Sequence, residues 1–183
     1  MPCCPVFRSV VLLVAAVSVA AAAGLVASRS ADTGDPPAAV TLQTIKHKQF
    51  LKAIKAHKGK VVVVDFWGEF CLPCKKEFPH LVAMHKRWAR DGLVCVSVSV
   101  DDDRRHDAAL KFLKAQGAAF PNYRLDEEPK VWQDHWDFNG PPALFVFDRA
   151  GKQAGRFDNN DPDKTYTDAD VEKLVQKVLR PGP

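Results

Sequence analysis

Two short runs of apolar residues stand out along the chain, and both are typical of buried strands. Val61–Trp67 is a continuous run of β-branched and aromatic residues interrupted by Asp65, and Leu93–Val100 alternates valine with cysteine and serine. Continuous runs of this length are typical of strands covered on both faces of a parallel sheet. Cys71–Arg90, between them, has the length and spacing of a helix. The three segments predict a β-α-β unit.

The segment before this unit has helical periodicity. Apolar residues recur at helical intervals within Thr44–His57, and Gly59 follows; the apolar positions are Ile45, Phe50, Leu51 and Ile54. This spacing predicts an amphipathic helix that ends before the glycine. After the unit, the pattern predicts a helix over Ala108–Gln116, a short strand within Ala119–Leu125 and a helix over Pro129–Phe138.

The C-terminal third predicts a hairpin and a closing helix. Ala143–Asp148 and Gln153–Phe157 have strand patterns, and Arg149–Lys152 has the composition of a turn. Thr167 and the acidic residue three positions later form a capping-box pattern, followed by an apolar stripe of Val171, Leu174, Val175 and Val178. Alternating strands and helices followed by these elements predict an α/β, three-layer sandwich with a central mixed sheet.

The first thirty residues have the composition of an export segment. Met1–Ser30 contains Arg8 and Arg29 but no acidic residue, and Val10–Val26 is almost entirely valine, leucine and alanine. This pattern predicts a signal peptide or an N-terminal membrane anchor, and the run has a length compatible with either. Residues 31–40 are rich in polar residues and proline and predict a linker, which leaves residues 41–183 as the folded domain. We therefore expect an extracytoplasmic protein, periplasmic or secreted.

Charge does not identify a partner. The formal net charge is +4, and it falls to +2 without residues 1–30 because Arg8 and Arg29 are lost. No basic stripe or nucleic-acid motif accompanies this small excess, so we expect no binding to nucleic acid.

Three of the five cysteines follow Ser30, namely Cys71, Cys74 and Cys95. Three is too few for the disulfide framework of a small secreted protein. Cys95 lies within an alternating strand pattern and is interpreted as a small buried core residue. The chemistry is therefore expected at the other two.

The pair Cys71 and Cys74 lies where a buried strand meets a helix. Free backbone N–H groups and the helix dipole stabilise a thiolate at a helix N-terminus, and two intervening residues allow the thiols to close a disulfide. A structural zinc site would need four ligands, and no second such pair is present. Covalent haem attachment would need histidine where Lys75 stands. A purely structural disulfide is the other alternative.

Two segments carry a resemblance to a known family. VVVVDFWGEFCLPCKKEFP resembles the active-site segment of the thioredoxin superfamily, and GPPALFVFDRAGK resembles its cis-proline strand and following turn. The resemblance extends from about Val40 to Leu179. The strand and helix within residues 119–138 resemble an insertion, and with the export segment they are most similar to the TlpA-like extracytoplasmic thiol-disulfide oxidoreductases.

The resemblance implies roles for individual residues. Cys71 would be the exposed nucleophile, Cys74 the buried resolving thiol, Asp65 the buried carboxylate beneath the pair, and Pro142 the cis-proline facing it. Pro79 matches the proline that kinks the following helix. From the residues alone, Asp65 is either a proton acceptor, with a pKa raised by burial, or a polar group at a strand end.

The chain also departs from the family pattern. Phe70 stands where the family usually has tryptophan, and the helix expected over Thr44–His57 replaces the N-terminal hairpin of the TlpA-like branch. An acidic helper residue follows the second strand in that branch, and Asp101 and Asp102 lie there. A run of charges at this place is otherwise interpreted as solvent-exposed, so neither residue is assigned.

The predicted function is thiol-disulfide exchange that reduces disulfides of exported proteins through a mixed disulfide at Cys71. The redox-active Cys71–Cys74 pair would serve without another cofactor or a metal. Recharging the reductant would need a membrane electron donor, and residues 10–26 would supply the tether. The alternatives are a copper-binding or non-catalytic thioredoxin-fold module, or a peroxiredoxin-like enzyme, although the threonine expected three residues before the nucleophile is replaced by Gly68.

Overall fold

The computed structural model describes residues 39–158 and 166–180. All of them belong to one compact unit, Asp35–Pro183. Within these ranges, no helix is both long enough and apolar enough to cross a membrane. The predicted signal or anchor segment, residues 1–30, lies outside the described residues, as does almost all of the predicted linker.

A mixed sheet forms the centre of the domain. Its strand order is β1-β4-β3-β2-β5-β6; β1, β4, β3 and β2 run parallel, and β5 and β6 are antiparallel to their neighbours. The strands are β1 (Gln43–Ile45), β2 (Val61–Trp67), β3 (Leu93–Ser99), β4 (Asn122–Leu125), β5 (Ala143–Phe147) and β6 (Gln153–Asp158). The predicted mixed sheet, β-α-β unit and hairpin are therefore confirmed.

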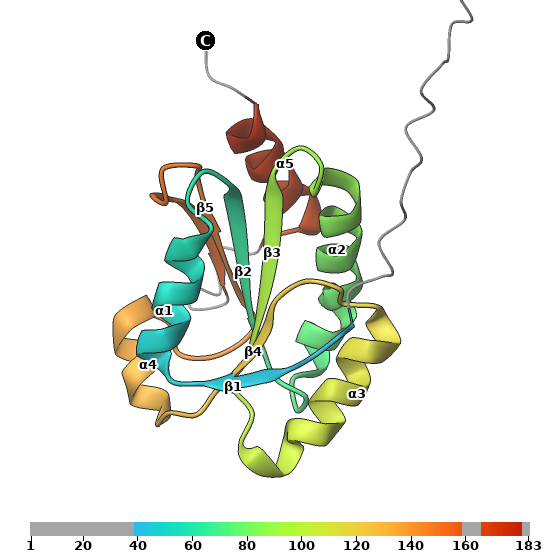
Figure 1. Ribbon diagram of the computed structural model, residues 1–183, viewed down its shortest axis with the longest axis vertical. Coiled ribbons are helices and arrows are strands. Elements are labelled where there is room, and N and C mark those ends of the chain that lie inside the picture. Colours follow the sequence, from blue (N-terminus) through green and yellow to red (C-terminus); the bar gives the residue numbers. More distant parts are fainter. Residues whose placement is uncertain (1–38, 159–165, 181–183) are drawn as a thin grey trace, which may run out of the picture. The chain divides into compact units, whose positions relative to one another are not determined.

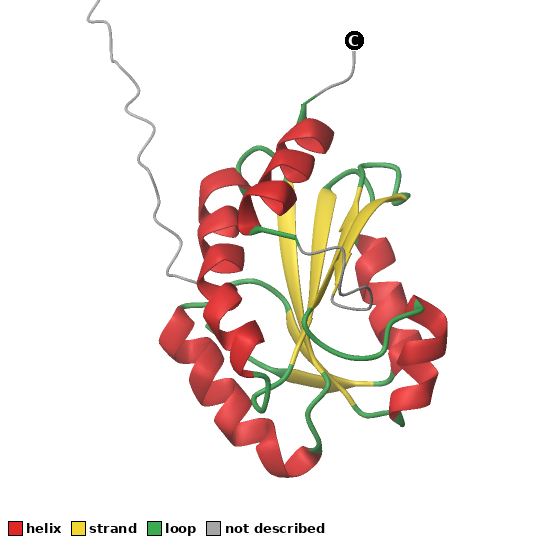
Figure 2. Ribbon diagram, turned by 180° about the vertical axis from the view of Figure 1, so that it is seen from behind, coloured by secondary structure: helices red, strands yellow, loops and turns green. Residues whose placement is uncertain are grey.

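Helices cover both faces of the sheet, which gives the predicted three layers (Figures 1 and 2). One face carries α1 (His47–Ala56) and α4 (Pro129–Trp136), and the other carries α2 (Leu72–Trp88), α3 (His106–Gln116) and α5 (Asp168–Leu179). The Thr167–Asp170 capping box begins α5 as expected. The inserted strand and helix are β4 and α4.

Side-chain alternation along β2 divides the core into two clusters. Val61, Val63 and Trp67 pack with α2, α3 and α5, whereas Val62, Val64 and Phe66 pack with α1 and α4. Successive strand residues point to opposite faces, so Asp65 belongs to the face that α2 covers. Trp132 and Trp136 of α4 are buried core residues of the second cluster.

The N-terminal element differs from the prediction. The expected helix over Thr44–His57 is divided, because Gln43–Ile45 forms β1 and the helix begins at His47. Ile45 is buried as the helical pattern suggested, but in a strand whose backbone pairs with Leu125 of β4. Pairing with a strand about eighty residues away overrides the local helical spacing.

Candidate functional site

The cysteine pair lies directly beyond the carboxyl end of β2. Every residue of β2 is buried, and the chain leaves the sheet after Trp67. The N–H of Cys71 donates to the carbonyl oxygen of Gly68 at 3.0 Å, and this turn leads into α2. The carboxyl ends of strands are where binding and reactive groups of α/β sheets usually lie. Because β2 is buried along its whole length, it gives the motif a rigid support.

Cys71 and Cys74 form a disulfide at the N-terminus of α2. Their Cα atoms are 5.3 Å apart, and the Cys71 sulfur accepts a hydrogen bond from the backbone N–H of Cys74 at 3.3 Å. Cys71 is the N-cap residue, so its sulfur faces the unpaired N–H groups and the positive end of the helix dipole. This arrangement stabilises a thiolate on Cys71 when the disulfide opens.

Both cysteines are buried in the disulfide form, so the expectation that Cys71 is exposed is wrong for this form of the protein. Cys71 is 7% exposed, and Cys74 is 2% exposed. The side chains on either side of Cys71 are much more open, with Phe70 54% and Leu72 61% exposed. Large apolar side chains exposed beside a reactive group are typical of a surface that contacts another molecule. The surface on either side of Cys71 is therefore apolar and much more open than the sulfur itself.

Phe70 is held in place by two neighbours. The guanidinium of Arg105 lies 5.7 Å from the centre of the Phe70 ring. The ring also packs against Gly68, where an added Cβ would lie 2.5 Å from a ring carbon. Gly68 therefore permits a close approach that a larger residue would prevent without moving the ring.

Charges near the motif are largely paired. The Lys75 ammonium lies 3.0 Å from a carboxylate oxygen of Glu69, and Arg105 lies 3.9 Å from the other oxygen. All three side chains are partly exposed, so the pairs contribute little to stability. The positive charges of Lys75 and Arg105 offset the negative charge of Glu69, which would otherwise disfavour a thiolate on Cys71.

Asp65 is a buried carboxyl group on the α2 side of the sheet. It is 6% exposed, and burial, with a smaller contribution from the negative charge of Glu77, raises its pKa to about 8. Cys74 is buried in the cluster on the same face. A carboxyl group that titrates in this range can exchange protons near neutral pH.

A small cavity of about 20 Å³ adjoins Asp65. Glu77 and His80 also line it, and its volume is about that of one water molecule. The Tyr166 hydroxyl donates to Glu77 at 3.2 Å, and burial raises the pKa of Glu77. These groups connect Asp65 with the partly exposed surface of α2.

Asp101 belongs to the site, although the sequence pattern left it unassigned. Its two carboxylate oxygens accept the N–H of Glu69 at 3.0 and 2.8 Å, and the Ser99 hydroxyl donates to one of them at 2.7 Å. Asp101 is 2% exposed, so the expectation of a solvent-exposed charge run is wrong for this residue. Its carboxylate fixes the loop that precedes Cys71. The sequence contained one sign of this burial. Serine and valine alternate along β3, and Asp101 continues the series of Ser97 and Ser99, which are themselves buried.

Asp102 has a different environment. Its carboxylate accepts a hydrogen bond from Arg104 at 2.6 Å on the surface and lies 3.9 Å from the guanidinium of Arg105. Cys95 is fully buried, and its thiol lies 3.7 Å from the carbonyl oxygen of Leu81, as expected for a core residue. Its burial, together with the charge of Asp65, raises the pKa of the Cys95 thiol.

Pro142 lies at the same end of the sheet as the cysteines. The Pro141–Pro142 peptide bond is cis, as predicted. Pro142 is buried and precedes Ala143, which pairs with Phe66 near the end of β2. Pro142, immediately before β5, therefore lies beside the end of β2. That end of β2 carries Asp65 and leads into the cysteine motif.

Histidine, cysteine, aspartate and glutamate side chains are scattered over the described residues, 39–158 and 166–180. Within those ranges, no three histidine, cysteine, aspartate or glutamate side chains gather in a way that could hold a metal ion.

Known proteins resemble this chain over the same region. It is 37% identical over 95 residues to the thiol-disulfide oxidoreductase ResA of Bacillus subtilis, covering 52% of this chain and 51% of that protein. It is 33% identical over 94 residues to the thiol:disulfide interchange protein HelX of Rhodobacter capsulatus, covering 51% of this chain and 49% of that protein. The chain thus spans about half the length of the curated relatives it matches.

A solved structure and a family model also match this chain. The crystal structure of a thioredoxin-family thiol:disulfide interchange protein from Chlorobium tepidum superposes with a TM-score of 0.54 at 26% identity, covering 69% of this chain and 84% of that one. The expected thioredoxin-like fold is therefore confirmed. The model of the AhpC/TSA family matches residues 33–154, which include β1–β5 and the cysteine pair. The chain belongs to the AhpC/TSA family, among relatives of the TlpA-like thiol-disulfide oxidoreductase type.

Proposed function

We propose that the protein is a thiol-disulfide oxidoreductase that acts on protein thiols or disulfides through Cys71. The observation that carries this proposal is the Cys71–Cys74 disulfide at the N-terminus of α2, directly after a fully buried strand. The relatives named thiol-disulfide oxidoreductase and thiol:disulfide interchange protein support it.

The exchange has two steps. In the reduced protein, the Cys71 thiolate attacks a substrate disulfide, forms a mixed disulfide and releases one substrate thiolate, which takes up a proton. The Cys74 thiol then loses its proton, and its thiolate attacks the Cys71 sulfur. The second substrate thiolate leaves and is protonated, and the Cys71–Cys74 disulfide forms. Two electrons and two protons pass to the substrate, and an external dithiol restores the reduced pair.

Asp65 would accept the proton of Cys74 in the second step. Both groups are buried on the side of the sheet that α2 covers, and the pKa of Asp65 lies at about 8. A carboxylate in this range can take a proton from a thiol and later return it to solvent. The small cavity shared with Glu77 supports that return path.

Phe70 and Leu72 would form the contact surface for a protein substrate, because both are exposed and apolar on either side of Cys71. Pro142 would border the same surface from the neighbouring strand, which the register of β2 and β5 supports.

Sequence features support one direction of exchange and one compartment. The dipeptide Leu72-Pro73 carries no histidine to stabilise the Cys71 thiolate strongly, which favours a reductant over a strong oxidant. The basic and apolar pattern of residues 1–30 favours export, with residues 10–26 cleaved or retained as a tether. A reductant outside the cytoplasm would then receive electrons from a membrane donor.

Disulfide reduction by the purified protein tests the proposal. With dithiothreitol as donor, the wild-type protein should accelerate reduction of insulin, and Cys71→Ser should abolish the acceleration. Cys95→Ser is the matched control and should retain activity, because Cys95 is buried in the core. Wild-type activity in Cys71→Ser would reject the proposal.

A trapping experiment tests the order of the two cysteines. Cys74→Ser should accumulate the mixed disulfide on Cys71, because the resolving thiol is absent. Accumulation on Cys74 in the Cys71→Ser variant instead would reverse the assignment. Direct peroxide consumption without disulfide reduction would favour the peroxiredoxin-like alternative, and a stoichiometric copper complex without disulfide reduction would favour a copper module.

A further inference from the structure

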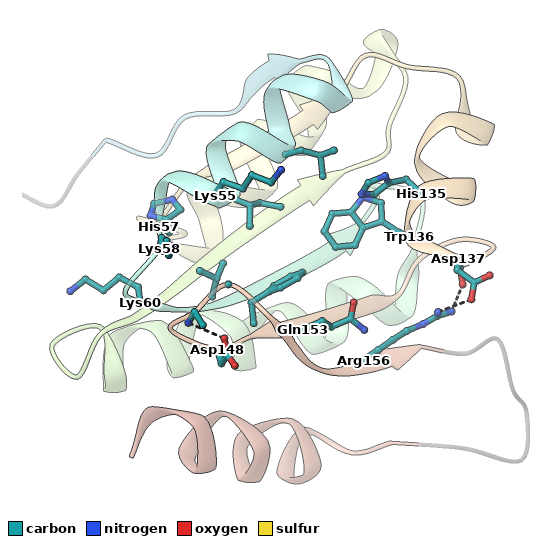
Figure 3. Close-up of a pocket in the computed structure, with 16 residues that line it drawn as sticks. Lys55, His57, Lys58, Lys60, His135, Trp136, Asp137, Asp148, Gln153 and Arg156 are labelled. Atoms are coloured by element: carbon teal, nitrogen blue, oxygen red, sulfur yellow. Dashed lines mark hydrogen bonds and ion pairs between the residues drawn. The ribbon is translucent and has the colours of Figure 1, made fainter. Parts of the chain in front are cut away.

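A cavity of about 650 Å³ lies on the other face of the sheet, away from the cysteine pair. It is open to solvent on one side and is bordered by the C-terminal half of α1, the end of α4 and the β5–β6 hairpin (Figure 3). We name it the α1–β5 cavity. Its volume lies within the range of about 300 to 1,000 Å³ that is typical of small-molecule sites.

The floor of the α1–β5 cavity is apolar. Trp136 and Val62 are buried residues of the core, and Leu51, Ile54 and Phe147 are partly exposed residues packed against that core. The rings of Trp136 and Phe147 lie 6.0 Å apart, centre to centre. The cavity therefore opens onto the edge of the hydrophobic core, where an apolar group would be removed from water.

The rim of the cavity is cationic. Lys55, Lys58, Lys60 and Arg156 line it, against the carboxylates of Asp137 and Asp148. In Figure 3, Lys55 extends across the cavity in the direction of His135 and Trp136, whereas Lys58 and Lys60 lie at the opposite end and the Lys60 side chain extends outward.

Both carboxylates are already engaged. Asp137 binds Arg156 at 3.2 Å, and Asp148 accepts the backbone N–H groups of Ala150 and Lys152, each at 2.9 Å. Arg156 is further paired with Asp158. By contrast, the three lysine ammonium groups make no hydrogen bond or ion pair with the described residues. The positive charge of the rim is therefore available to a ligand.

We propose that the α1–β5 cavity binds an amphipathic organic anion, a small molecule with an apolar body and a carboxylate or similar anionic head. The body lies against Trp136, Phe147 and Ile54, and the head meets the lysines at the rim. An apolar floor with a few charged groups at its edge is the usual composition of such sites. A neutral apolar molecule would leave the lysines without a partner, and a cation would be repelled by them.

This site is independent of the redox chemistry. Lys60 and Val62 lie at the start of β2 and Cys71 follows its end, so the lysine end of the cavity is a strand length, roughly 20 Å, from Cys71. Trp136 packs against Phe66 near the end of β2, but on the opposite face of the sheet from the cysteine pair. Changes to the cavity are therefore expected to leave disulfide exchange at the wild-type rate.

Octanoate is a suitable probe, with octanol and octylammonium as neutral and cationic comparators of the same chain length. Titration of the ¹⁵N-labelled full chain should give saturable shifts at Trp136 and Gly151, with no comparable shift at Cys71. For a ligand of this size, we expect a dissociation constant of about 0.1 to 1 mM. Octanol should bind more weakly, and octylammonium should bind least.

Charge-reversal variants distinguish binding by the rim lysines from a general effect of the protein's net charge. The double variant Lys55→Glu/Lys58→Glu should weaken octanoate binding by about tenfold or more. The matched control Lys48→Glu/Lys52→Glu changes the same charge on exposed positions of α1 that do not line the cavity, and it should alter binding by less than about twofold. Ala150→Trp should block the cavity while keeping every charge.

Several results would overturn the proposal. These are the absence of saturable shifts in the wild type, equal binding of octanol and octanoate, equal losses in the two double variants, and unchanged binding in Ala150→Trp. The amide spectrum of each variant reports whether it is folded, and Ala150→Trp supplies a test that does not depend on the lysines.

Discussion

Replacing Asp65 with asparagine should change how the stability of the protein depends on pH. In the unfolded chain this carboxyl group has a pKa near 3.8, and in the folded protein its pKa is about 8 because it is buried. Between these values the folded protein holds a proton that the unfolded chain has lost. The free energy of unfolding of the wild type therefore falls as the pH rises from about 4 to 8.

The size of the effect follows from the same shift. Each pH unit within the window costs up to about 1.4 kcal/mol, so the wild type should lose roughly 4 kcal/mol between pH 5 and pH 8 through this group. Asparagine has nearly the same shape and does not titrate. Asp65→Asn should consequently be more stable than the wild type at pH 8, and the difference should shrink toward pH 5.

Urea unfolding of the oxidised proteins at pH 5, 6, 7 and 8 measures this difference. Asp91→Asn is the matched control, because it makes the same chemical change at an exposed position. Stability profiles of wild type and Asp65→Asn that run parallel would refute the reasoning, since they would mean that burial does not keep the carboxyl group protonated. If the ionised fraction of Asp65 accepts the Cys74 proton, the same variant should slow disulfide exchange by up to about 100-fold, and the loss should grow as the pH rises toward 8, where more of the carboxyl group is ionised.

Three further predictions concern neighbouring groups. Cys95 should resist a thiol reagent in the native protein and react after unfolding, because its thiol is buried and its pKa is raised; rapid native labelling would contradict this. Asp101→Ala should lower the free energy of unfolding by about 1 to 3 kcal/mol, since the Glu69 N–H loses its acceptor, whereas Asp102→Ala on the surface should change it by less than about 1 kcal/mol. The reduction potential, measured against glutathione, should lie closer to about −270 mV than to about −120 mV, and a value near the latter would make the protein an oxidant.

The strongest elements of the fold were predictable from local patterns. The run Val61–Trp67 became β2 with the predicted bounds, and the hairpin and the capped last helix appeared where turn and capping residues indicated them. Such patterns succeed because a strand buried on both faces must be apolar throughout, and because helix caps satisfy specific backbone groups.

The first strand could not be predicted in this way. Gln43–Ile45 forms β1 because its backbone pairs with β4, whose residues lie about eighty positions later. The apolar spacing that continues into α1 is compatible with a helix, and local propensity is weak over three residues. The pairing partner, rather than the segment itself, determined the element.

The features of the candidate site can also be sorted into those that the sequence determined and those that the tertiary structure decided. The sequence by itself determined that Cys71 and Cys74 stand at a strand-to-helix junction, and that an acidic residue interrupts the strand before them. The tertiary structure decided that Asp101 is buried against the Glu69 N–H and that burial raises the pKa of Asp65. It also placed lysines from α1 and the loop after it at the rim of a cavity with an apolar floor. These properties depend on burial and on contacts between distant segments, and neither is encoded in the spacing of neighbouring residues.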